Sequence, residues 1–275
     1  MLVPWWEDTR RRYDGLVVER LGLRGRLGEV ATYALAGGKR IRPLLAEAIG
    51  EALAAPSDAV TRVAIAVEYL HTASLLLDDL PAMDRARERR GVEPAHLRFS
   101  EADAILAAVT LVARSYAIML GDREDDMGMR HSMAQRVSST IVGMAGGQSL
   151  ELAIDTEARR DDVESIHQRK TAALFALVAR LISTATGADD STMTSFVRFA
   201  EAFGAAYQIW DDLQDRGVEG EQRGNLACLV GADPARQMAR AHLRGARDAL
   251  GQLGTPSTLL SLCVEWLSES LEAVA

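Results

Sequence analysis

Apolar residues recur at three- and four-residue spacing along most of the chain, and the strict alternation of apolar and polar residues that marks a strand is not found. Short acidic, glycine or proline breaks separate the periodic segments. The pattern predicts helices over residues 8–22, 28–36, 43–55, 58–79, 100–120, 127–154, 161–186, 191–215, 234–252 and 257–273. Because the helical pattern is nearly continuous and contains no fixed-period repeat, we expect an all-α fold in a single domain over residues 1–275.

Several predicted helices have residues at their ends that favour a start or a stop. Ser57 and Ser100 stand where an N-cap side chain would accept a hydrogen bond from the first turn. Asp233 precedes a proline, which predicts a capped start with proline in the first turn. Pro81 should end or bend the helix that carries Asp78, because proline has no backbone N–H to donate.

The composition narrows the class of protein. The chain is 48% hydrophobic and carries a net charge of −8 without a basic block, which supports a buried core and argues against a nucleic-acid partner. Its two cysteines, Cys228 and Cys263, form neither a disulfide framework nor a metal-ligand spacing, as is usual in a reducing cytoplasm. The first residues lack the order of a signal peptide, and no uncharged apolar run reaches the ~18 residues needed to span a bilayer. We therefore expect a cytoplasmic protein with no transmembrane segment.

Two clusters of aspartates end apolar helical runs. LLLDDLPAMDRARERRG, residues 75–91, contains Asp78, Asp79 and Asp84. YQIWDDLQD, residues 207–215, ends a different helix, and there Asp211 and Asp215 share one face. Carboxylates this close raise one another's pKa unless a cation lies between them, and the C-terminal end of a helix disfavours negative charge. A hard cation such as Mg²⁺ would offset both effects, while solvated helix ends are the alternative for either cluster alone.

Polar residues share helix faces with these aspartates. His71 and Ser74 lie one or two turns before Asp78 on the same face, and Gln208 lies one turn before the second cluster. Oxygen and nitrogen donors stacked along one face indicate a site for a cation or a polar ligand at that end of each helix.

A candidate anion site comes from GGKRIRP, residues 37–43, where Lys39, Arg40 and Arg42 follow two glycines. Glycine lets a ligand approach the backbone closely, and arginines bind phosphate oxygens in pairs. Further donors could complete a site that holds a diphosphate without a metal: Arg89, Arg90 and His96. An ordinary basic loop is the alternative.

The two lysines of the chain are also candidate ligands of an anion. Lys39 and Lys170 are the only lysines in a Lys+Arg total of 31, which suggests places where a compact ammonium is needed, with chance as the alternative. Lys170 and Thr171 open an apolar helix in RKTAALF, residues 169–175, where a basic residue is unfavourable unless an anion binds. Before them, GMAGGQSLEL, residues 143–152, places three glycines and then Gln148 in a helical pattern, which indicates that another helix packs close.

In this order, GGKRIRP, HTASLLLDDLPAMD, RRG, GGQ, KT and YQIWDDLQD resemble the motifs of trans-isoprenyl diphosphate synthases, the polyprenyl synthetase family, over roughly residues 30–250. The set is specific, although no single motif is. Within the family the sequence is most similar to bacterial geranylgeranyl diphosphate synthases. The resemblance implies an isoprenoid synthase helical bundle with a central active-site cavity, and a homodimer. It also implies Mg²⁺-dependent head-to-tail condensation of isopentenyl diphosphate with an allylic diphosphate, giving the C20 product geranylgeranyl diphosphate.

The resemblance also implies roles for individual residues. Two aspartate motifs would bind three Mg²⁺ ions that hold the allylic diphosphate: Asp78, Asp79 and Asp84, with a two-residue insertion, and Asp211, Asp212 and Asp215. The same diphosphate would be contacted by Arg89, Lys170, Thr171 and Gln208. Isopentenyl diphosphate would be bound by Lys39, Arg42, Arg90 and His96. The residues expected to be most directly catalytic are Asp78, Asp79, Asp84, Lys170 and Asp211.

Product length depends, in this family, on the residue five positions before the first aspartate, where a bulky aromatic stops the chain at C15. Here the position is Ala73, followed by Ser74, and a small residue leaves a deeper pocket that favours C20. Met119 or a facing helix could instead form the floor of the pocket that limits the length of the product.

The sequence departs from the family pattern in two places. The segment after the second motif, RGVEGEQRGNLACLVG, residues 216–231, is shorter than usual and lacks the family's lysines, and Leu77 replaces a common histidine. The alternatives are a farnesyl or longer-chain synthase, a class I terpene cyclase, and an inactive partner subunit of a prenyl synthase. A cyclase has no use for GGKRIRP and RRG, and a partner subunit would be expected to lose aspartates.

Overall fold

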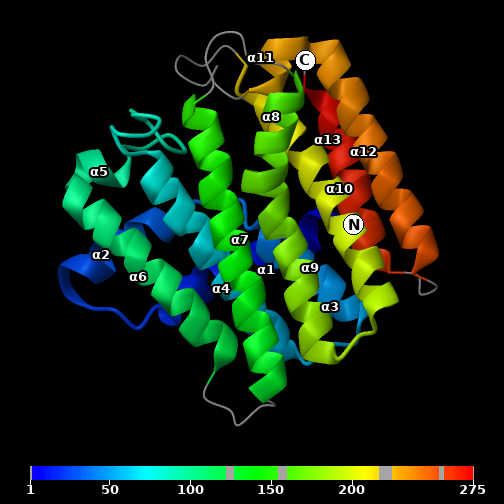
Figure 1. Ribbon diagram of the computed structural model, residues 1–275, viewed down its shortest axis with the longest axis horizontal. Coiled ribbons are helices and arrows are strands. Elements are labelled where there is room, and N and C mark those ends of the chain that lie inside the picture. The colour runs from blue at the N-terminus through cyan, green and yellow to red at the C-terminus, as the bar shows by residue number, and fades with distance from the viewer. Residues whose placement is uncertain (1, 122–126, 154–159, 217–224, 254–256, 275) are drawn as a thin grey trace. The chain divides into compact units, whose positions relative to one another are not determined.

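The computed structural model describes residues 2–121, 127–153, 160–216, 225–253 and 257–274. These residues are almost entirely helical and none of them forms a strand, so the prediction of an all-α fold is confirmed (Figure 1). The described helices are α1 (Leu2–Glu19), α2 (Gly25–Leu35), α3 (Ile41–Ala52), α4 (Ser57–Asp78), α5 (Ala95–Arg98), α6 (Glu101–Leu120), α7 (Met127–Ala153), α8 (Arg160–His167), the π-helical turn η1 (Gln168–Ala172), α9 (Ala173–Thr186), α10 (Asp190–Gln214), α11 (Leu226–Val230), α12 (Ala232–Gln252) and α13 (Thr258–Ala273).

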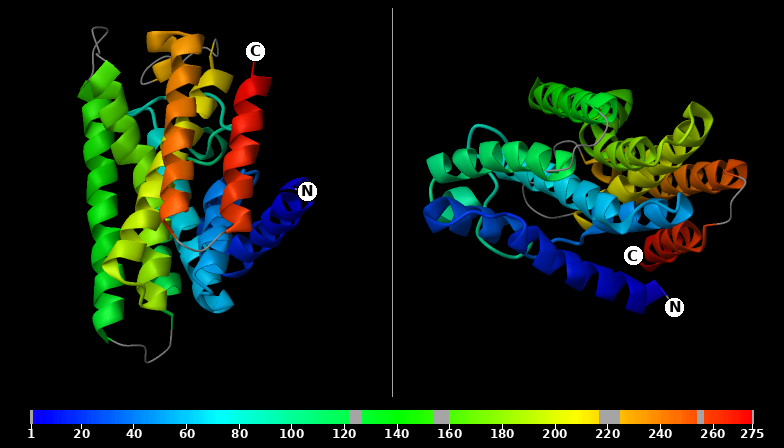
Figure 2. Two further views of the ribbon diagram at one scale, coloured as in Figure 1. Left: turned by 90° about the vertical axis from the view of Figure 1, so that its right-hand side faces the viewer. Right: turned by 90° about the horizontal axis from the view of Figure 1, so that it is seen from below.

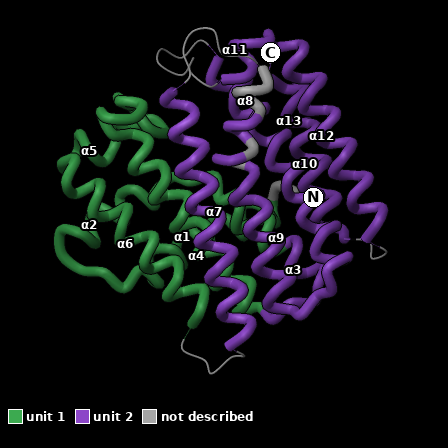
Figure 3. The backbone as a smooth tube through the Cα atoms, in the orientation of Figure 1, with its two compact units in different colours: residues 1, 3–47, 57–126 green, residues 2, 48–56, 127–275 purple. Residues whose placement is uncertain are grey.

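The helices group into two compact units, coloured separately in Figure 3. Apart from the first two residues, unit 1 comprises residues 3–47 and 57–126, and unit 2 comprises residues 48–56 and 127–275. The first aspartate motif and GGKRIRP lie in unit 1, whereas the second aspartate motif and Lys170 lie in unit 2. A single domain over residues 1–275 stays a prediction.

Unit 1 is built on α4, which packs against α6 and α2. Buried residues occur on every side of α4, among them Val63, Val67 and Leu70, which explains why its sequence is apolar all round rather than along one stripe. The Tyr69 hydroxyl on α4 donates to the carbonyl of Val17, 2.7 Å away, and so fastens the end of α1 to the same core.

Unit 2 is built on α10, which packs against α9, α11, α12, α13 and η1. The long helices α9, α10, α12 and α13 run side by side in both views (Figures 1 and 2). A Cβ atom at Gly204 of α10 would lie 2.8 Å from the ring of Phe175 on α9, so this glycine lets the two helices approach closely. On α12, which also packs against α10, the buried residues include Ala235, Ala239 and Ala246.

The predicted helix ends are partly right. Ser100 caps α6, its hydroxyl accepting from the Asp103 N–H at 3.0 Å, and α4 ends at Asp78, before Pro81. The prediction of an N-cap at Asp233 is wrong, because Gly231, with φ of 90°, turns the chain into α12 earlier. α1 begins at Leu2 rather than near residue 8, since a proline in the first turn costs no helical hydrogen bond.

Two of the described helices, α4 and α6, are long and apolar enough to cross a membrane by length and composition. The search for an uncharged run in the sequence did not find them, because each contains charged residues. In α4, 67% of the apolar window is buried inside the protein, as in a core helix. In α6 only 33% of the window is buried, so much of an apolar helix faces outward.

Candidate active site

The first aspartate motif turns back on itself where α4 ends. The N–H groups of Asp84 and Ala86 donate to the carbonyls of Asp78 and Asp79, at 2.9 and 3.2 Å. Asp79 is only 4% exposed, and its Oδ1 accepts from Nε and Nη2 of Arg89 at 2.9 and 2.5 Å. Asp78 is half-buried and Asp84 is exposed, so these two carboxylates are more open to a ligand than Asp79 is.

The glycines of GGKRIRP make room for arginine side chains. A Cβ atom at Gly38 would lie 2.7 Å from Nη1 of Arg40 and 3.3 Å from Nη1 of Arg90. Gly37 has a φ of 72°, a conformation that side chains other than glycine rarely adopt. The two glycines therefore allow a turn at which two guanidinium groups lie close to the backbone.

Arg40 anchors this turn rather than facing a ligand. It is 2% exposed and donates to Glu68 on α4 at 2.6 Å and to Asp14 on α1 at 2.8 Å. On either side of this anchor, Lys39 is exposed and Arg42 is 6% exposed. The sequence pattern did not identify Glu68 as the partner that holds the segment.

His71 is the histidine that the arginines of unit 1 surround. Burial lowers the pKa of His71 well below its usual value, and nearby guanidinium charges lower it further. Those charges belong to Arg42, Arg90, Arg89 and Arg40, in order of decreasing effect. Helical periodicity places His71 on the same face as Asp78, but the nearby arginines come from other segments of the chain and leave no sign in that pattern.

His96 and Arg90 both lie in unit 1. His96 is on the short helix α5, is 7% exposed, and has no hydrogen-bond partner for Nδ1 among the described residues. Arg90 is exposed and donates to the carbonyl of Ala36 at 3.2 Å, which places it beside the glycine turn. A role of His96 in binding isopentenyl diphosphate stays a prediction.

The second aspartate motif closes α10 in unit 2. Asp211 and Asp215 are half-buried, whereas Asp212 is 5% exposed. Gln208 Nε2 donates to Asp212 Oδ1 at 2.7 Å, and the Leu226 N–H donates to Asp212 Oδ2 at 2.8 Å. Gln208, which was expected to contact a diphosphate, thus also supports Asp212.

Burial raises the pKa of Asp212, and the donors around it oppose that effect. His167 is the strongest opposing charge, with its Nε2 3.6 Å from Asp212 Oδ2, followed by the hydrogen bonds from Gln208 and Leu226. Asp211 next to it raises the pKa again. His167 and Leu226 had no sequence signal that linked them to the motif.

Lys170 lies in η1, the π-helical turn between α8 and α9. Its ammonium donates to Glu151 on α7, a partner that the sequence analysis missed. A Cβ atom at Gly147 would lie 2.9 Å from Cβ of Arg169 and 3.0 Å from Cγ of Lys170, so the predicted close packing is confirmed at this glycine. Turns of π-helix often occur at functional sites, and this one replaces the uninterrupted helix predicted over 161–186.

Two further predicted contacts lie near this turn. Gln148 is 9% exposed, and neither side-chain polar atom has a hydrogen-bond partner within the described part of the chain. The backbone of Thr171 belongs to η1, but its side chain lies outside the described residues, as do residues 217–224 of the shortened segment. The proposed role of Thr171 stays a prediction.

The aspartates suit an Mg²⁺ ion that is coordinated partly by the substrate's phosphates rather than by protein ligands alone. Among the described residues, no three carboxylate, imidazole or thiolate groups converge to hold a metal. Mg²⁺ usually keeps several waters and binds through one or two carboxylates plus the phosphates of its substrate. Oxygen donors such as Asp78 and Asp211 therefore fit Mg²⁺ that arrives with a diphosphate.

Ala73 and Ser74 occupy the position expected to influence product length. Ala73 is 2% exposed on α4, and the Ser74 hydroxyl donates to the carbonyl of His71 at 2.8 Å. Both side chains are small, as the sequence argument requires. Met119 on α6 is buried, also in unit 1.

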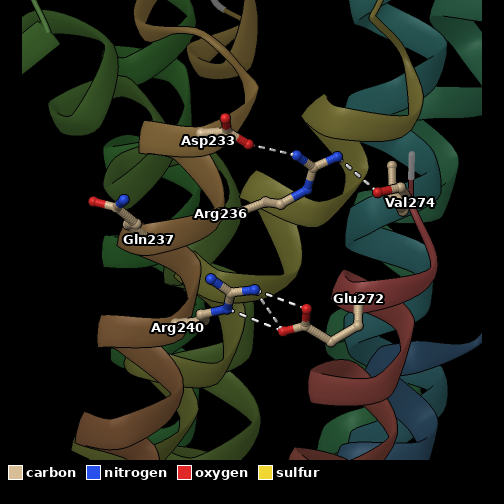
Figure 4. A pocket seen from close by; sticks show the side chains of 6 residues that line it. All are labelled: Asp233, Arg236, Gln237, Arg240, Glu272 and Val274. Atoms are coloured by element: carbon tan, nitrogen blue, oxygen red, sulfur yellow. Dashed lines mark hydrogen bonds and ion pairs between the residues drawn. The ribbon is translucent and has the colours of Figure 1, made fainter.

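A pocket of about 360 Å³ lies between α12 and α13, and none of the residues that line it is a predicted site residue (Figure 4). Arg236 donates to Asp233 and to the carbonyl of Val274, and Arg240 donates to both carboxylate oxygens of Glu272. These pairs tie the end of α13 to α12, which is a structural role.

The structure thus brings together two sets of predicted residues. In unit 1 it joins Asp79 to Arg89 and gathers arginines around His71. In unit 2 it joins Gln208 to Asp212, and Lys170 of η1 to Glu151 of α7. Each unit contains one aspartate motif and at least one cationic side chain suited to a phosphate.

Known proteins with similar sequences or structures give a consistent picture. The polyprenyl synthetase family matches residues 24–228. The chain is 35% identical over 247 residues to farnesyl diphosphate synthase of Escherichia coli (strain K12), covering 82% of this chain and 81% of that protein. It is 37% identical over 227 residues to geranylgeranyl diphosphate synthase of Pseudescherichia vulneris, covering 77% of this chain and 73% of that protein. The crystal structure of geranyltranstransferase from Thermotoga maritima matches with a TM-score of 0.81 at 29% identity, covering 98% of both chains.

The relatives carry both farnesyl and geranylgeranyl names, so a particular closeness to geranylgeranyl diphosphate synthases is not confirmed. The family match spans most of the chain and includes both aspartate motifs, and the fold agrees over nearly the whole length. The chain therefore belongs to the polyprenyl synthetase family and is an all-α prenyltransferase.

Proposed function

We propose that this prenyltransferase condenses isopentenyl diphosphate head-to-tail with an allylic diphosphate, with Mg²⁺ as cofactor, and that its main product is geranylgeranyl diphosphate. Relatives named for farnesyl and for geranylgeranyl diphosphate synthesis support the reaction type. The C20 length of the product is a more specific proposal, and it rests on the small residues Ala73 and Ser74 of α4.

The observation that carries the proposal is the cationic cluster around His71. Arg40 and Arg89 of this cluster are paired with Glu68 and Asp79, and a diphosphate bound beside Arg42 and Arg90 would add further favourable ion pairs to the cluster. A terpene cyclase, which takes one diphosphate through its metals, does not need a second anion site. An enzyme with two diphosphate substrates does, so the cluster favours a condensing prenyltransferase.

We assign the two diphosphates to different side chains. Isopentenyl diphosphate binds at the glycine turn of unit 1, through Lys39, Arg42, Arg90 and His96, and we add His71 to this set because Arg42 and Arg90 are among the charges that act on it. The allylic diphosphate binds through Mg²⁺ held by aspartates of both motifs, and through Arg89, Lys170, Thr171 and Gln208; the family resemblance counts Asp212 among these aspartates, but both of its carboxylate oxygens accept hydrogen bonds from the protein. The number of ions, three, follows from the family resemblance.

The reaction follows from the charges of these groups. Bound Mg²⁺ would neutralise the diphosphate and stabilise it as a leaving group. Lys170, already placed by Glu151, adds a positive charge where negative charge develops as the allylic C–O bond breaks. The electron pair leaves with the diphosphate, the isopentenyl double bond attacks the allylic cation, and the released diphosphate takes the proton. Apolar helix walls keep water from the cation.

The C20 product is favoured because Ala73 fills little of the space beside α4. Its side chain is buried and ends at Cβ, so it does not block a chain growing along the helix toward earlier turns. A farnesyl diphosphate synthase is the second candidate, because relatives of that name are similarly close.

We also propose that the enzyme is a homodimer, as the family resemblance implies. The outward face of α6 is apolar, with Ile105 42%, Leu106 58% and Val109 61% exposed. Exposed apolar side chains at such spacing on one helix are typical of an interface. A second copy of the chain would remove them from water and explain why so little of α6 is buried.

Substitution of one aspartate in each motif tests the metal assignment. Asp78→Ala and Asp211→Ala should each lower turnover by about 100-fold or more while circular dichroism stays unchanged, because electrostatic stabilisation of the leaving group is lost. Asp190→Ala is the matched control, since Asp190 is an exposed aspartate at the other end of the helix that carries Asp211. Undiminished turnover in either motif variant contradicts the assignment.

A further inference from the structure

Helical geometry divides the second aspartate motif into two faces. Asp211 and Asp215 are four residues apart and share one face of α10, while Gln208 and Asp212 share another, about 100° around the helix. Asp211 and Asp215 are half-buried, but Asp212 is 5% exposed. The motif therefore contains side chains in two different environments.

Both oxygens of the Asp212 carboxylate are engaged by other parts of the protein. Gln208 Nε2 donates to Oδ1 at 2.7 Å, and the backbone N–H of Leu226 donates to Oδ2 at 2.8 Å. His167 Nε2, from α8, lies 3.6 Å from Oδ2. A buried carboxylate with donors on both oxygens is well satisfied, and losing it would leave those donors unpaired.

Asn225 makes the contact reciprocal. Its Nδ2 donates to the backbone carbonyl of Asp212 at 2.9 Å, and its Oδ1 accepts from the Cys228 N–H at 2.8 Å, which caps the start of α11. α11 has only five residues, too few to be stable through its own hydrogen bonds. Its position therefore depends on anchors such as Asp212 and Asn225.

We propose that Asp212 is a positioning residue that fastens the start of α11 to the last turn of α10. Asp212 and Asn225, 13 residues apart in sequence, form this clasp, and it fixes the point at which the chain rejoins α10 after the second motif. Its effect on the reaction rests on the proposed function, because the clasp holds the turn of α10 from which Asp211 and Asp215 would meet Mg²⁺.

Site-resolved hydrogen–deuterium exchange of the metal-free protein tests the clasp without any reaction. Asp212→Ala should speed exchange at the Leu226 and Cys228 amides by about tenfold, the effect of losing one buried hydrogen bond. Asn225→Ala should do the same although it removes no carboxylate. Asp211→Ala is the matched control and should leave these amides unchanged.

The conservative variant Asp212→Asn separates positioning from simple destabilisation. Its oxygen can accept from the Leu226 N–H, and its amide can donate to Gln208 if the Gln208 amide turns over. Exchange protection and kcat should both recover most of what Asp212→Ala loses, with KM for both substrates near that of the wild type. Asn225→Ala should lower kcat without raising the Mg²⁺ concentration that gives half-maximal activity, whereas Asp211→Ala should raise it.

Three results would overturn the proposal: unchanged exchange in Asp212→Ala, faster exchange with full activity, or an Asp212→Asn variant that regains protection but not kcat. The last result would make Asp212 a metal ligand. If the wild-type enzyme elongates no allylic substrate, the proposed function fails, while the exchange data still decide whether the clasp exists.

Discussion

Replacing Glu68 with glutamine should destabilise the protein strongly, because it removes the buried partner of Arg40. The two side chains are 2% and 1% exposed, and Arg40 Nη1 lies 2.6 Å from Glu68 Oε1. The remaining charged partner, Asp14, is 36% exposed and contacts only Nε. Breaking a buried pair costs about 3–5 kcal/mol, and because glutamine still offers an acceptor oxygen we expect about 3 kcal/mol in the free energy of unfolding.

The assay is urea unfolding followed by circular dichroism, with thermal melting as a second measure. About 3 kcal/mol corresponds to a melting temperature lower by roughly 6–12 °C in a protein of this size. Asp58→Asn is the control, since it removes an exposed pair with Arg62 that should contribute about 0.5 kcal/mol. Because Arg40 anchors the turn between Lys39 and Arg42, Glu68→Gln should also raise KM for isopentenyl diphosphate. A loss below about 1 kcal/mol, similar to the control, would refute the reasoning.

Three other predictions follow from the surroundings of individual side chains. Ala73→Phe should shorten the product, as measured by chain-length analysis, because an aromatic ring would fill the space beside α4; an unchanged length would place the floor of the pocket elsewhere. The pKa of His71 is lowered in the folded protein, so as the pH falls the unfolded chain binds a proton here near pH 6.5, where the folded chain does not. The contribution of His71 to the free energy of unfolding is therefore complete above that pH and is lost as the pH falls below it. His71→Gln should therefore flatten the fall in melting temperature below pH 6.5, and parallel curves for the two proteins would contradict this. Burial raises the pKa of Cys263 to about 12, so a thiol reagent should label exposed Cys228 and leave Cys263 unmodified in the folded protein; rapid labelling of both would contradict it.

The fold was predictable from sequence because hydrophobic periodicity reports helix directly. The long helices appear near their predicted bounds, and Ser100 caps α6 as expected. The short helices α5 and α11 could not be predicted, since five residues or fewer carry no period. The interruption at η1, where Arg169 and Lys170 pack closely against Gly147, was also missed, because the apolar period continues through it.

The candidate site was predictable as a set of motifs but not as a set of contacts. The sequence identified both aspartate motifs, yet it could not show that Asp79 and Asp212 are buried while their neighbours are more open. It also gave no sign that Arg40 is an anchor or that Glu151 holds Lys170, because those partners are distant in sequence. Long-range pairs of this kind depend on tertiary packing, which periodicity does not encode.

Incubation of the purified protein with Mg²⁺, labelled isopentenyl diphosphate and each allylic starter of C5, C10 or C15 tests the central claim most directly, with the released alcohols separated by chain length. We expect elongation, with a C20 alcohol as the main product. A C15 product alone would retain the reaction and correct the chain length. No elongation with any starter, together with hydrocarbons formed from farnesyl or geranylgeranyl diphosphate alone, would contradict the account and indicate a terpene cyclase, and a complete lack of turnover would indicate a partner subunit.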